Sequence, residues 1–268
     1  MKAINQSPSN IFQRTIVVGD LHGCYDELIE LLTSIDFSAA DRVVAVGDLT
    51  VKGPKSRETL DLFIADRRFR SVLGNHDLAL LRFWRGGQHK FTGAQKQTAR
   101  ELEFDREKYS SFLSSLPLMI DLDSHLVVHA GLRPDRPLDQ QDADDLLELR
   151  TLGRKKRTSR KGTPWYEVYD GDKVVLFGHW PAPEPRRGPR AIGLDTGCVY
   201  GNRLTAYIVE TDELLSVPAR FFYRKASDRF YKSGEPLGDI HTAASAARSS
   251  FPIPPSGEAV NKLRSIIE

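Results

Sequence analysis

Five short apolar segments of this chain each run directly into a glycine-containing turn that carries an aspartate, an asparagine or a histidine. The segments are TIVV (15–18), RVVAV (42–46), FRSVL (69–73), HLVV (125–128) and KVVLF (173–177), and the turns are GDLHG (19–23), GD (47–48), GNHD (74–77), HAG (129–131) and GH (178–179). Runs of this length, rich in β-branched residues and bounded by turn formers, are typical of buried strands. In open α/β sheets ligands bind at the carboxyl ends of strands, so the pattern predicts one site built from several strand ends.

Segments with helical spacing alternate with the first of these strands. Apolar residues recur on one helix face along 25–35 and again along 56–66, namely Leu28, Leu31, Leu32 and Ile35, then Leu60, Phe63 and Ile64. The order strand, helix, strand, helix, strand predicts an α/β domain with a partly parallel sheet. The later strands, which include RLTAYIVE (203–210), follow one another more closely and predict a second, more antiparallel sheet.

The chain divides by composition into a main domain over residues 1–225 and an accessory extension over 226–268. Scattered Ser, Ala, Gly and Pro occupy most of the extension, which predicts a partly irregular segment. Its last eleven residues, EAVNKLRSIIE, carry helical spacing and favour a short terminal helix. We expect the first ten residues to be frayed.

Composition narrows the class of protein further. The chain has 268 residues with 38 Lys and Arg against 36 Asp and Glu, so its net charge of +2 excludes a histone-like polycation and an acidic disordered tail. Two cysteines, Cys24 and Cys198, make no disulfide framework, and we expect both to be small buried residues of a protein in a reducing compartment. No apolar run approaches the roughly 20 residues of a membrane helix, and the first residues resemble no signal peptide. These features predict a soluble, cytoplasmic protein with no membrane partner.

The polar residues at the strand ends are of the types that bind metal ions. Each alone has an ordinary interpretation, because Asp after Gly commonly forms a turn or caps a helix, and a single His after a strand is commonly a hydrogen-bonded core residue. Together they supply oxygen and imidazole ligands without a thiolate, a set that suits Mn²⁺, Fe or Zn²⁺ in an open site. The six candidates are Asp20, His22, Asp48, Asn75, His129 and His179. Six ligands fit two ions that share a bridging carboxylate and act on a phosphoryl group.

In order and spacing, these turns resemble the motif series of the phosphoprotein phosphatase family of calcineurin-like metallophosphoesterases. The motifs are GDLHG (19–23), GDLTVKG (47–53), GNHD (74–77), HAG (129–131) and GH (178–179), and the resemblance spans residues 15 to about 210. It implies an α/β fold, the αββα sandwich of two mixed β-sheets flanked by helices. It also implies a dinuclear centre, with manganese favoured and iron or zinc as alternatives, that hydrolyses phosphate bonds with a metal-bound hydroxide.

The resemblance also implies a role for each site residue. Asp20 and His22 would bind the first ion, Asp48 would bridge, and Asn75, His129 and His179 would bind the second. His76 would be the general acid that protonates the leaving group. Two basic residues would hold the substrate phosphate, Lys52 and the Arg150 that ends LLELR (146–150). Tyr200 is a further candidate for a substrate contact.

Two positions depart from the protein phosphatases of this family. Lys52 stands where an arginine is usual, which keeps the charge and loses the bidentate fork. Val51 stands where an aspartate pairs with the catalytic histidine, so His76 needs another partner or keeps a less raised pKa. GNHD (74–77), GHW (178–180) and LDTGC (194–198) resemble bacterial symmetrical diadenosine tetraphosphatases instead, whereas the short spacer 132–178 and DTGCVYGNRLTA (195–206) resemble small bacterial Ser/Thr protein phosphatases.

The sequence therefore predicts a metal-dependent phosphoesterase whose substrate is a small phosphorylated molecule or a phosphoprotein. Dinucleoside polyphosphates are favoured by Val51, Asp77 and Trp180, and phosphoprotein Ser/Thr esters are the alternative favoured by the short spacer. A nuclease and a catalytically silent phosphate-binding protein are further alternatives, the second suggested only by Lys52 and Val51. The oligomeric state is left open.

The basic segment RKKRTSRK (154–161) has two equal interpretations, a flap over the metal centre that attracts a polyanion, and a solvated loop. Nucleic acid is not favoured as a partner, because no aromatic residues are interleaved with the charge. Trp165, Tyr166 and Tyr169 are predicted to pack in the core rather than to stack on a base. The acidic residues between 135 and 148 are predicted to begin a helix and to form its solvated face.

Overall fold

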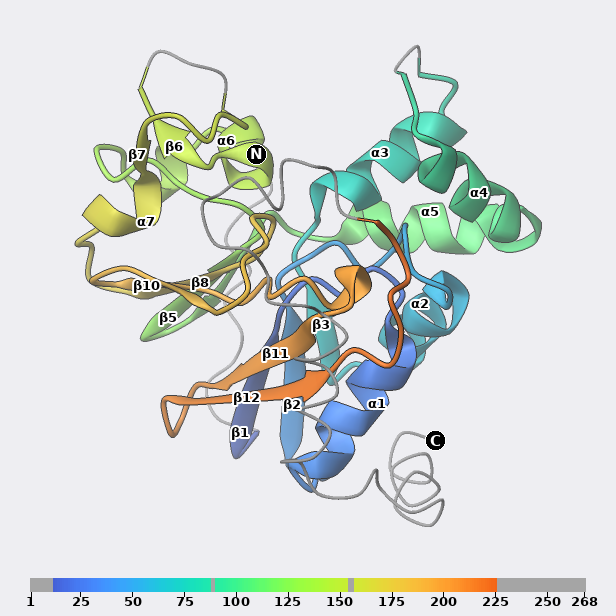
Figure 1. Cartoon of the computed structure of the whole chain (residues 1–268), viewed down its shortest axis with the longest axis horizontal. Helices are drawn as coiled ribbons and strands as arrows, with labels where there is room; N and C mark the ends of the chain where they lie inside the picture. Colours follow the sequence, from blue (N-terminus) through green and yellow to red (C-terminus); the bar gives the residue numbers. More distant parts are fainter. Residues whose placement is uncertain (1–11, 88–89, 154–156, 226–268) are drawn as a thin grey trace.

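In the computed structural model, which describes residues 12–87, 90–153 and 157–225, the first sheet is built around the predicted βαβαβ unit (Figure 1). It contains β1 (Arg14–Val18), β2 (Asp41–Ala45), β3 (Phe69–Ser71), β11 (Arg203–Ile208) and β12 (Glu213–Pro218), in the order β12-β11-β1-β2-β3. The three N-terminal strands are parallel. β11 runs antiparallel to β1, and β12 antiparallel to β11. The carboxyl ends of β1, β2 and β3 therefore lie at one edge of the sheet.

The second sheet has the order β4-β5-β8-β10-β9. Its strands are β4 (Met119–Leu122), β5 (His125–Val128), β8 (Val174–Phe177), β9 (Arg186–Arg187) and β10 (Ala191–Gly193). β5, β8 and β10 are parallel, and only the two outer strands are antiparallel to their neighbours. A separate two-stranded ladder pairs β6 (Thr151–Leu152) with β7 (Thr163–Pro164).

Helices cover the outer faces of both sheets (Figure 1). They are α1 (Tyr25–Ser34), α2 (Ser56–Ala65), α3 (Asn75–Trp84), α4 (Gly93–Glu101), α5 (Arg106–Ser115), α6 (Ala143–Glu148) and α7 (Trp165–Val168), with 3₁₀ turns at Glu103–Asp105, Leu138–Gln140 and Cys198–Tyr200. α1 and α2 lie beside the first sheet, α6 and α7 beside the second, and α3 to α5 form a group of their own next to α2 (Figure 1).

The layers follow from the alternation of side chains along the strands. In β1, Ile16 packs in the core beneath the helices of the first sheet, whereas its neighbour Val17 packs in a second core between the two sheets. In the second sheet, Val127 lies in the core between the sheets and Val128 in a third core under α6 and α7. Three apolar cores thus separate four layers, which confirms the predicted αββα sandwich of two mixed sheets.

One part of the predicted topology was wrong. The second sheet is not mainly antiparallel, because the chain from β5 to β8 is long enough to carry α6 and α7 and return in the same direction. The strand predicted at 203–210 is β11, and it pairs with β1 in the first sheet. The predicted helices over 25–35 and 56–66 correspond to α1 and α2.

Helix α4 shows why some elements had no sequence signal. Its sequence, GAQKQTARE, has no apolar stripe, so hydrophobic periodicity does not reveal it. The helix instead begins with a capping box. The backbone N–H of Gln95 donates to Thr92 Oγ1 at 3.3 Å, and the backbone N–H of Thr92 donates to Gln95 Oε1 at 2.8 Å.

The aromatic residues of α7 pack in the core, as predicted. Trp165 is fully buried, with its ring centroid 4.9 Å from that of Phe177 and its Nε1–H donating to the carbonyl oxygen of Ala130 at 3.1 Å. Tyr166 and Tyr169 are buried in the same core. This hydrogen bond ties α7 to the HAG turn (129–131), of which Ala130 is the middle residue.

The acidic segment before and within α6 is only partly as predicted. Asp142 caps the helix by accepting from the backbone N–H of Asp144 at 2.9 Å, which agrees with a helix start. Asp145, however, is buried rather than solvated, because Arg133 Nε and Arg157 Nε donate to its two oxygens at 2.5 and 2.6 Å. Arg157, the first described residue of the basic segment after 154–156, is thus bound to α6.

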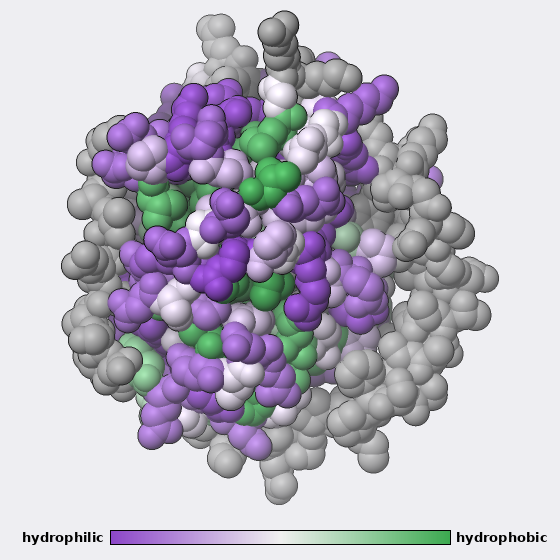
Figure 2. Space-filling view, turned by 90° about the vertical axis from the view of Figure 1, so that its left-hand side faces the viewer, coloured by the Kyte–Doolittle hydropathy of each residue, from purple (hydrophilic) through white to green (hydrophobic). Residues whose placement is uncertain are grey.

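Among the described residues, few large apolar side chains are exposed. Figure 2 shows one face on which hydrophilic side chains predominate, with hydrophobic areas that are small and scattered. Within the described residues, no helix is long and apolar enough to cross a membrane. The predicted extension over 226–268, its terminal helix and the frayed residues 1–10 lie outside the described residues, so the domain boundary at 225 stays a prediction.

We expect Trp165→Phe to lower the free energy of unfolding by about 1–3 kcal/mol, because it leaves the Ala130 carbonyl without its buried donor. Urea denaturation followed by circular dichroism measures this change. The matched control is Phe104→Leu, at a position that is 94% exposed, where a change within about 0.5 kcal/mol is expected. Equal stability of Trp165→Phe and wild type would show that the hydrogen bond beneath the HAG turn contributes nothing.

Candidate metal centre

All six candidate ligands lie at the carboxyl ends of strands, on loops that converge from both sheets. The loops after β1 and β2 carry Asp20, His22 and Asp48, and Asn75 begins α3 just after β3. His129 and His179 follow β5 and β8 of the second sheet. Three of the six have backbone conformations in the left-handed region, His22 (φ 47°), Asp48 (φ 52°) and His179 (φ 64°). Non-glycine residues rarely adopt this conformation, and they tend to occur at functional sites.

Two glycines allow the loops to approach the carboxylates. A Cβ atom on Gly178 would lie 2.0 Å from Asp20 Oδ1, and one on Gly74 would lie 2.2 Å from Asp48 Oδ1. Any other residue would therefore displace the carboxylate that it touches. This close approach explains why a glycine precedes Asn75 and another precedes His179.

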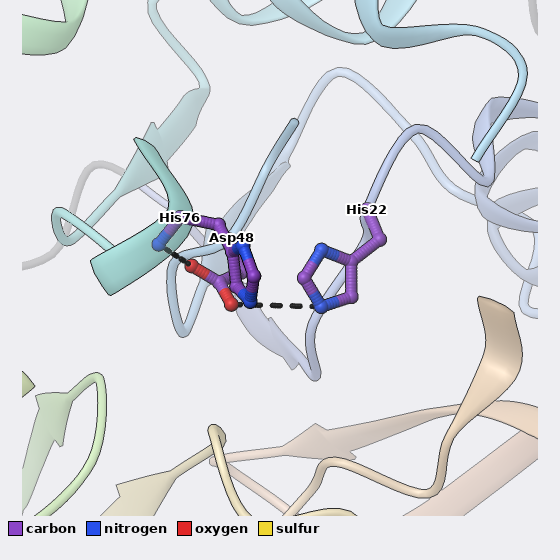
Figure 3. Close-up of side chains that lie close together, drawn as sticks. All are labelled: His22, Asp48 and His76. Carbon is purple, nitrogen blue, oxygen red and sulfur yellow. Dashed lines mark hydrogen bonds and ion pairs between the residues drawn. The ribbon is translucent and has the colours of Figure 1, made fainter. Parts of the chain in front are cut away.

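Asp48 faces His22 on one side, as Figure 3 shows, and His129 on the other. Its Oδ2 is 3.5 Å from His22 Nε2, and its Oδ1 is 3.6 Å from His129 Nε2. The backbone N–H of His76 donates to Asp48 Oδ1 at 2.8 Å and fixes the carboxylate. The two oxygens thus face two different imidazoles, the arrangement expected of a carboxylate that bridges two cations.

The other candidate ligands extend the site on both sides of Asp48. Asp20 Oδ2 is 3.9 Å from His22 Nε2, and Asp20 also accepts from the backbone N–H of His179 at 3.1 Å. On the other side, Asn75 Oδ1 is 2.9 Å from His129 Nε2 and 3.0 Å from His179 Nδ1. The structure therefore brings all six candidates together in one cluster, in which all but the partly buried Asn75 are buried.

Hydrogen bonds to backbone carbonyls orient two of the imidazoles. His22 Nδ1–H donates to the Thr50 carbonyl oxygen at 3.0 Å, and His129 Nδ1–H donates to that of Val46 at 2.9 Å. In the neutral imidazole the other nitrogen, Nε2, then carries a lone pair that faces the carboxylates. Metal-binding histidines typically donate the N–H of their other ring nitrogen to a carbonyl or carboxylate oxygen in this way.

The electrostatics of the cluster also fit divalent cations. Burial raises the pKa of Asp20 well above its usual range, with further contributions from the charges of Asp195 and Asp48, and burial raises the pKa of Asp48 to about 6. Burial lowers the pKa of His129 to about 4 and that of His179 well below its usual value. His179 Nε2 is buried with no hydrogen-bond partner. Carboxylates that resist ionisation and imidazoles that stay neutral would both gain from a bound cation.

The predicted phosphate-binding residues lie at the edge of this cluster. Lys52 Nζ is 2.8 Å from His22 Nε2 and 5.4 Å from the centroid of the Tyr200 ring, so both residues reach the site. Arg150 Nη2 donates to the carbonyl oxygen of His179 at 3.3 Å, while its Nε is buried without a partner. Burial lowers the pKa of Arg150 to about 10, which still leaves it charged at neutral pH.

His76, the candidate general acid, lies beside the cluster without a carboxylate partner for its ring. Its Nδ1 is buried and has no hydrogen-bond partner in the described part of the chain. Its ring packs edge-on against that of His22, with the ring centroids 5.2 Å apart. Val51, at the position of the missing aspartate, is fully buried and offers no acceptor. Burial, together with the charge of Lys52, lowers the pKa of His76 well below its usual value.

Two aspartates of the site had no role assigned from the sequence. Asp77 is fully buried and accepts four hydrogen bonds, from the backbone N–H groups of Leu49, Thr50 and Gly74 and from the Thr50 hydroxyl, at 2.8–3.3 Å. It thereby holds the loop of Asp48 against the start of α3. Burial and the charge of Asp48 raise its pKa to about 6. In the sequence, Asp77 stands out only as the last residue of GNHD (74–77), a motif that serves to compare this chain with branches of the family.

Asp195 follows β10 and is also buried near the candidate ligands. Burial raises its pKa to about 6, with Asp48 adding to the effect and Lys52 opposing it. The apolar run AIGL before Asp195-Thr196-Gly197 repeats the pattern of the other strand ends. This pattern is the signal that could have identified Asp195.

Comparisons with known proteins point to one family. A family profile described as calcineurin-like phosphoesterase matches residues 13–214. The chain is 32% identical over 242 residues to an asymmetrical bis(5'-nucleosyl)-tetraphosphatase of Bacillus subtilis, with 80% of this chain and 98% of that protein covered. It is also 32% identical over 266 residues to a symmetrical bis(5'-nucleosyl)-tetraphosphatase of Vibrio parahaemolyticus, with 76% and 98% covered.

Among solved structures, one proposed to be a diadenosine tetraphosphatase is 35% identical with a TM-score of 0.67, covering 80% of this chain and 96% of that chain. The resemblance that the motifs indicated is confirmed. The chain therefore belongs to the calcineurin-like phosphoesterase family and is a metal-dependent phosphoester hydrolase.

Proposed function

We propose that this protein hydrolyses dinucleoside polyphosphates at a site that holds two divalent cations. The observation that carries the proposal is the position of Asp48, whose two oxygens lie 3.5 and 3.6 Å from the Nε2 atoms of His22 and His129. A carboxylate placed in this way suits a bridge between two cations. The tetraphosphatase relatives of both types support the substrate class.

Six residues would hold the cations in this proposal. Asp20 and His22 would bind one, Asn75, His129 and His179 would bind the other, and Asp48 would bind both. When bound, the cations supply positive charge for the phosphoryl oxygens and lower the pKa of water, so that hydroxide is available as a nucleophile at neutral pH. A ligand set with oxygen and imidazole but no thiolate suits manganese, iron or zinc, and manganese is the one proposed, because the family resemblance favours it.

The chain itself binds and orients the substrate. Lys52 and Arg150 point positive charge at the cluster from its edge, and the charges of Arg160 and Arg186 also act on Arg150. A polyphosphate carries several negative charges. Several cationic side chains near the cluster therefore suit a polyphosphate better than they suit a single phosphate. Asp77 keeps the Asp48 loop in place through its four hydrogen bonds.

His76 holds the proton for the leaving oxygen in this proposal. Its ring sits in contact with His22, and its Nδ1 has no competing partner among the residues that the structure describes. Because burial lowers the pKa of His76, the imidazolium form needs the negative charge of a bound substrate to stabilise it.

The proposal also includes a cytoplasmic location, which the two free thiols support.

Product analysis tests the substrate class. We expect manganese-loaded protein to degrade diadenosine tetraphosphate and to leave a phosphoserine peptide intact, as measured by chromatography of nucleotides and by phosphate release. ADP alone would identify symmetrical cleavage, and ATP with AMP would identify asymmetrical cleavage. Phosphate released from the peptide, with the dinucleotide untouched, would replace the proposal with a Ser/Thr protein phosphatase, the alternative that the short spacer 132–178 favours.

His76→Asn tests the proton donor. We expect kcat to fall by about 10²- to 10⁴-fold while the metal content per chain stays unchanged, because the variant removes a proton donor and no ligand. Steady-state kinetics and metal analysis of the same preparation measure the two effects. His125→Asn, a change to a histidine of β5 that contacts Ser124 and Tyr207, is the control and should keep its kcat. A parallel loss of metal and activity in His76→Asn would contradict the assigned role.

Arg150→Ala tests the phosphate contact. Loss of a charged hydrogen-bond donor should raise KM for diadenosine tetraphosphate by about 10- to 100-fold. Arg187→Ala removes an exposed arginine of the neighbouring strand β9 and should change KM much less, which separates a direct contact from a change in overall charge. If both variants kept the KM of the wild type, the phosphate would have to bind elsewhere.

A further inference from the structure

A second cluster of ligand-type side chains lies behind the catalytic loops. Cys24 immediately follows GDLHG and precedes α1, Glu27 is in the first turn of α1, and Cys198 begins the 3₁₀ turn after LDTG. One ligand atom from each lies within 4.8 Å of those of the other two. Their exposed fractions are 0%, 0% and 2%. None of the three has a part in the function proposed above.

Glu27 has one oxygen that is satisfied and one that is not. Its Oε1 accepts from the backbone N–H of Arg220 at 2.9 Å and from the Tyr223 hydroxyl at 2.8 Å. Its Oε2 is buried and has no hydrogen-bond partner within residues 12–87, 90–153 and 157–225. A buried carboxylate oxygen without a partner is costly, because it has lost its water without compensation. This oxygen therefore points to a ligand that the protein alone does not provide.

The two thiols give the cluster a chemistry different from that of the aspartate–histidine centre. Both cysteines are free and buried, and their sulfur atoms lie within 4.8 Å of each other. A thiol is a weak hydrogen-bond donor, whereas a thiolate is a strong ligand for zinc and for softer cations. Two sulfurs with a carboxylate form a compact set that selects a thiophilic cation over manganese or magnesium.

We propose that Cys24, Glu27 and Cys198 form a second metal site, which binds one thiophilic divalent cation such as Zn²⁺. On binding, each thiol releases its proton to solvent, two metal–sulfur bonds form, and the Glu27 carboxylate adds metal–oxygen bonding through one or both oxygens. No atom changes its oxidation state. The cation balances the two thiolates and satisfies the oxygen that lacks a partner.

Such a site would have a structural role. It would join the start of α1 to the turn that follows β10, and Glu27 would extend the link to residues 220 and 223. These elements directly follow the loops that carry His22 and Asp195. Because the cluster is closed to solvent, the cation would bind as the chain folds, as structural zinc does.

The test uses cadmium as a spectroscopic probe on the full-length chain. The chain has only two cysteines, so absorption from thiolate-to-cadmium charge transfer can arise from no other site. The protein is unfolded and refolded with reductant and Cd²⁺, and both the absorption and the metal content per chain are measured. We expect the charge-transfer band in wild type, and its loss together with one ion per chain in the Cys24→Ser, Cys198→Ser double variant.

Two controls keep the outcome clear. Asp20→Asn should reduce metal binding at the aspartate–histidine centre and keep the thiolate band, which separates the two sites without any assay of activity. If the serine variant fails to fold, X-ray absorption of zinc-refolded wild type decides, since the proposed site requires sulfur in the zinc coordination shell. A refolded wild type without a thiolate band, or zinc surrounded by nitrogen and oxygen alone, would overturn the proposal.

Discussion

The structure depends on holding several carboxylates out of water at one place. Asp20, Asp48, Asp77 and Asp195 are all nearly or fully buried at the edge where the two sheets meet, and burial is the main cause of the raised pKa of each. Backbone N–H donors offset this cost by fixing each carboxylate. The donors come from a neighbouring loop for Asp20, Asp48 and Asp77 and from the same turn for Asp195. Glycines, left-handed backbone conformations and neutral histidines around them follow from that requirement.

The same requirement explains how much of the site was predictable from the sequence. A ligand on a short loop after a β-branched strand leaves a local signal, and the six candidate ligands with His76 were found in this way and do converge. Asp195 leaves the same signal after AIGL, but that run is short and contains glycine, so it was not recognised as a strand. Asp77 could not be identified as a positioning residue from its neighbours, because its partners Leu49 and Thr50 are far from it along the chain.

The fold was predictable where apolar periodicity and turn chemistry agreed, as in β1, α1, β2 and α2. It was not predictable where stability comes from partners distant in sequence. β12 is an edge strand with half-exposed residues, and α4 is a polar helix held by a capping box and by packing on α3. The direction of the central strands of the second sheet depends on where the crossover between β5 and β8 packs. The sequence of a short segment cannot predict this position.

The pairing of β1 with β11 affects how the chain folds during its synthesis. β1 lies near the start of the chain, yet its neighbour in the sheet is formed by residues 203–208, and Asp20 accepts a backbone hydrogen bond from His179. During synthesis on the ribosome, the first βαβαβ unit therefore emerges with one side of β1 open and with its buried carboxylates incompletely satisfied. The centre can assemble only after most of the polypeptide has been made, so nascent chains depend on protection of that open edge until β11 arrives.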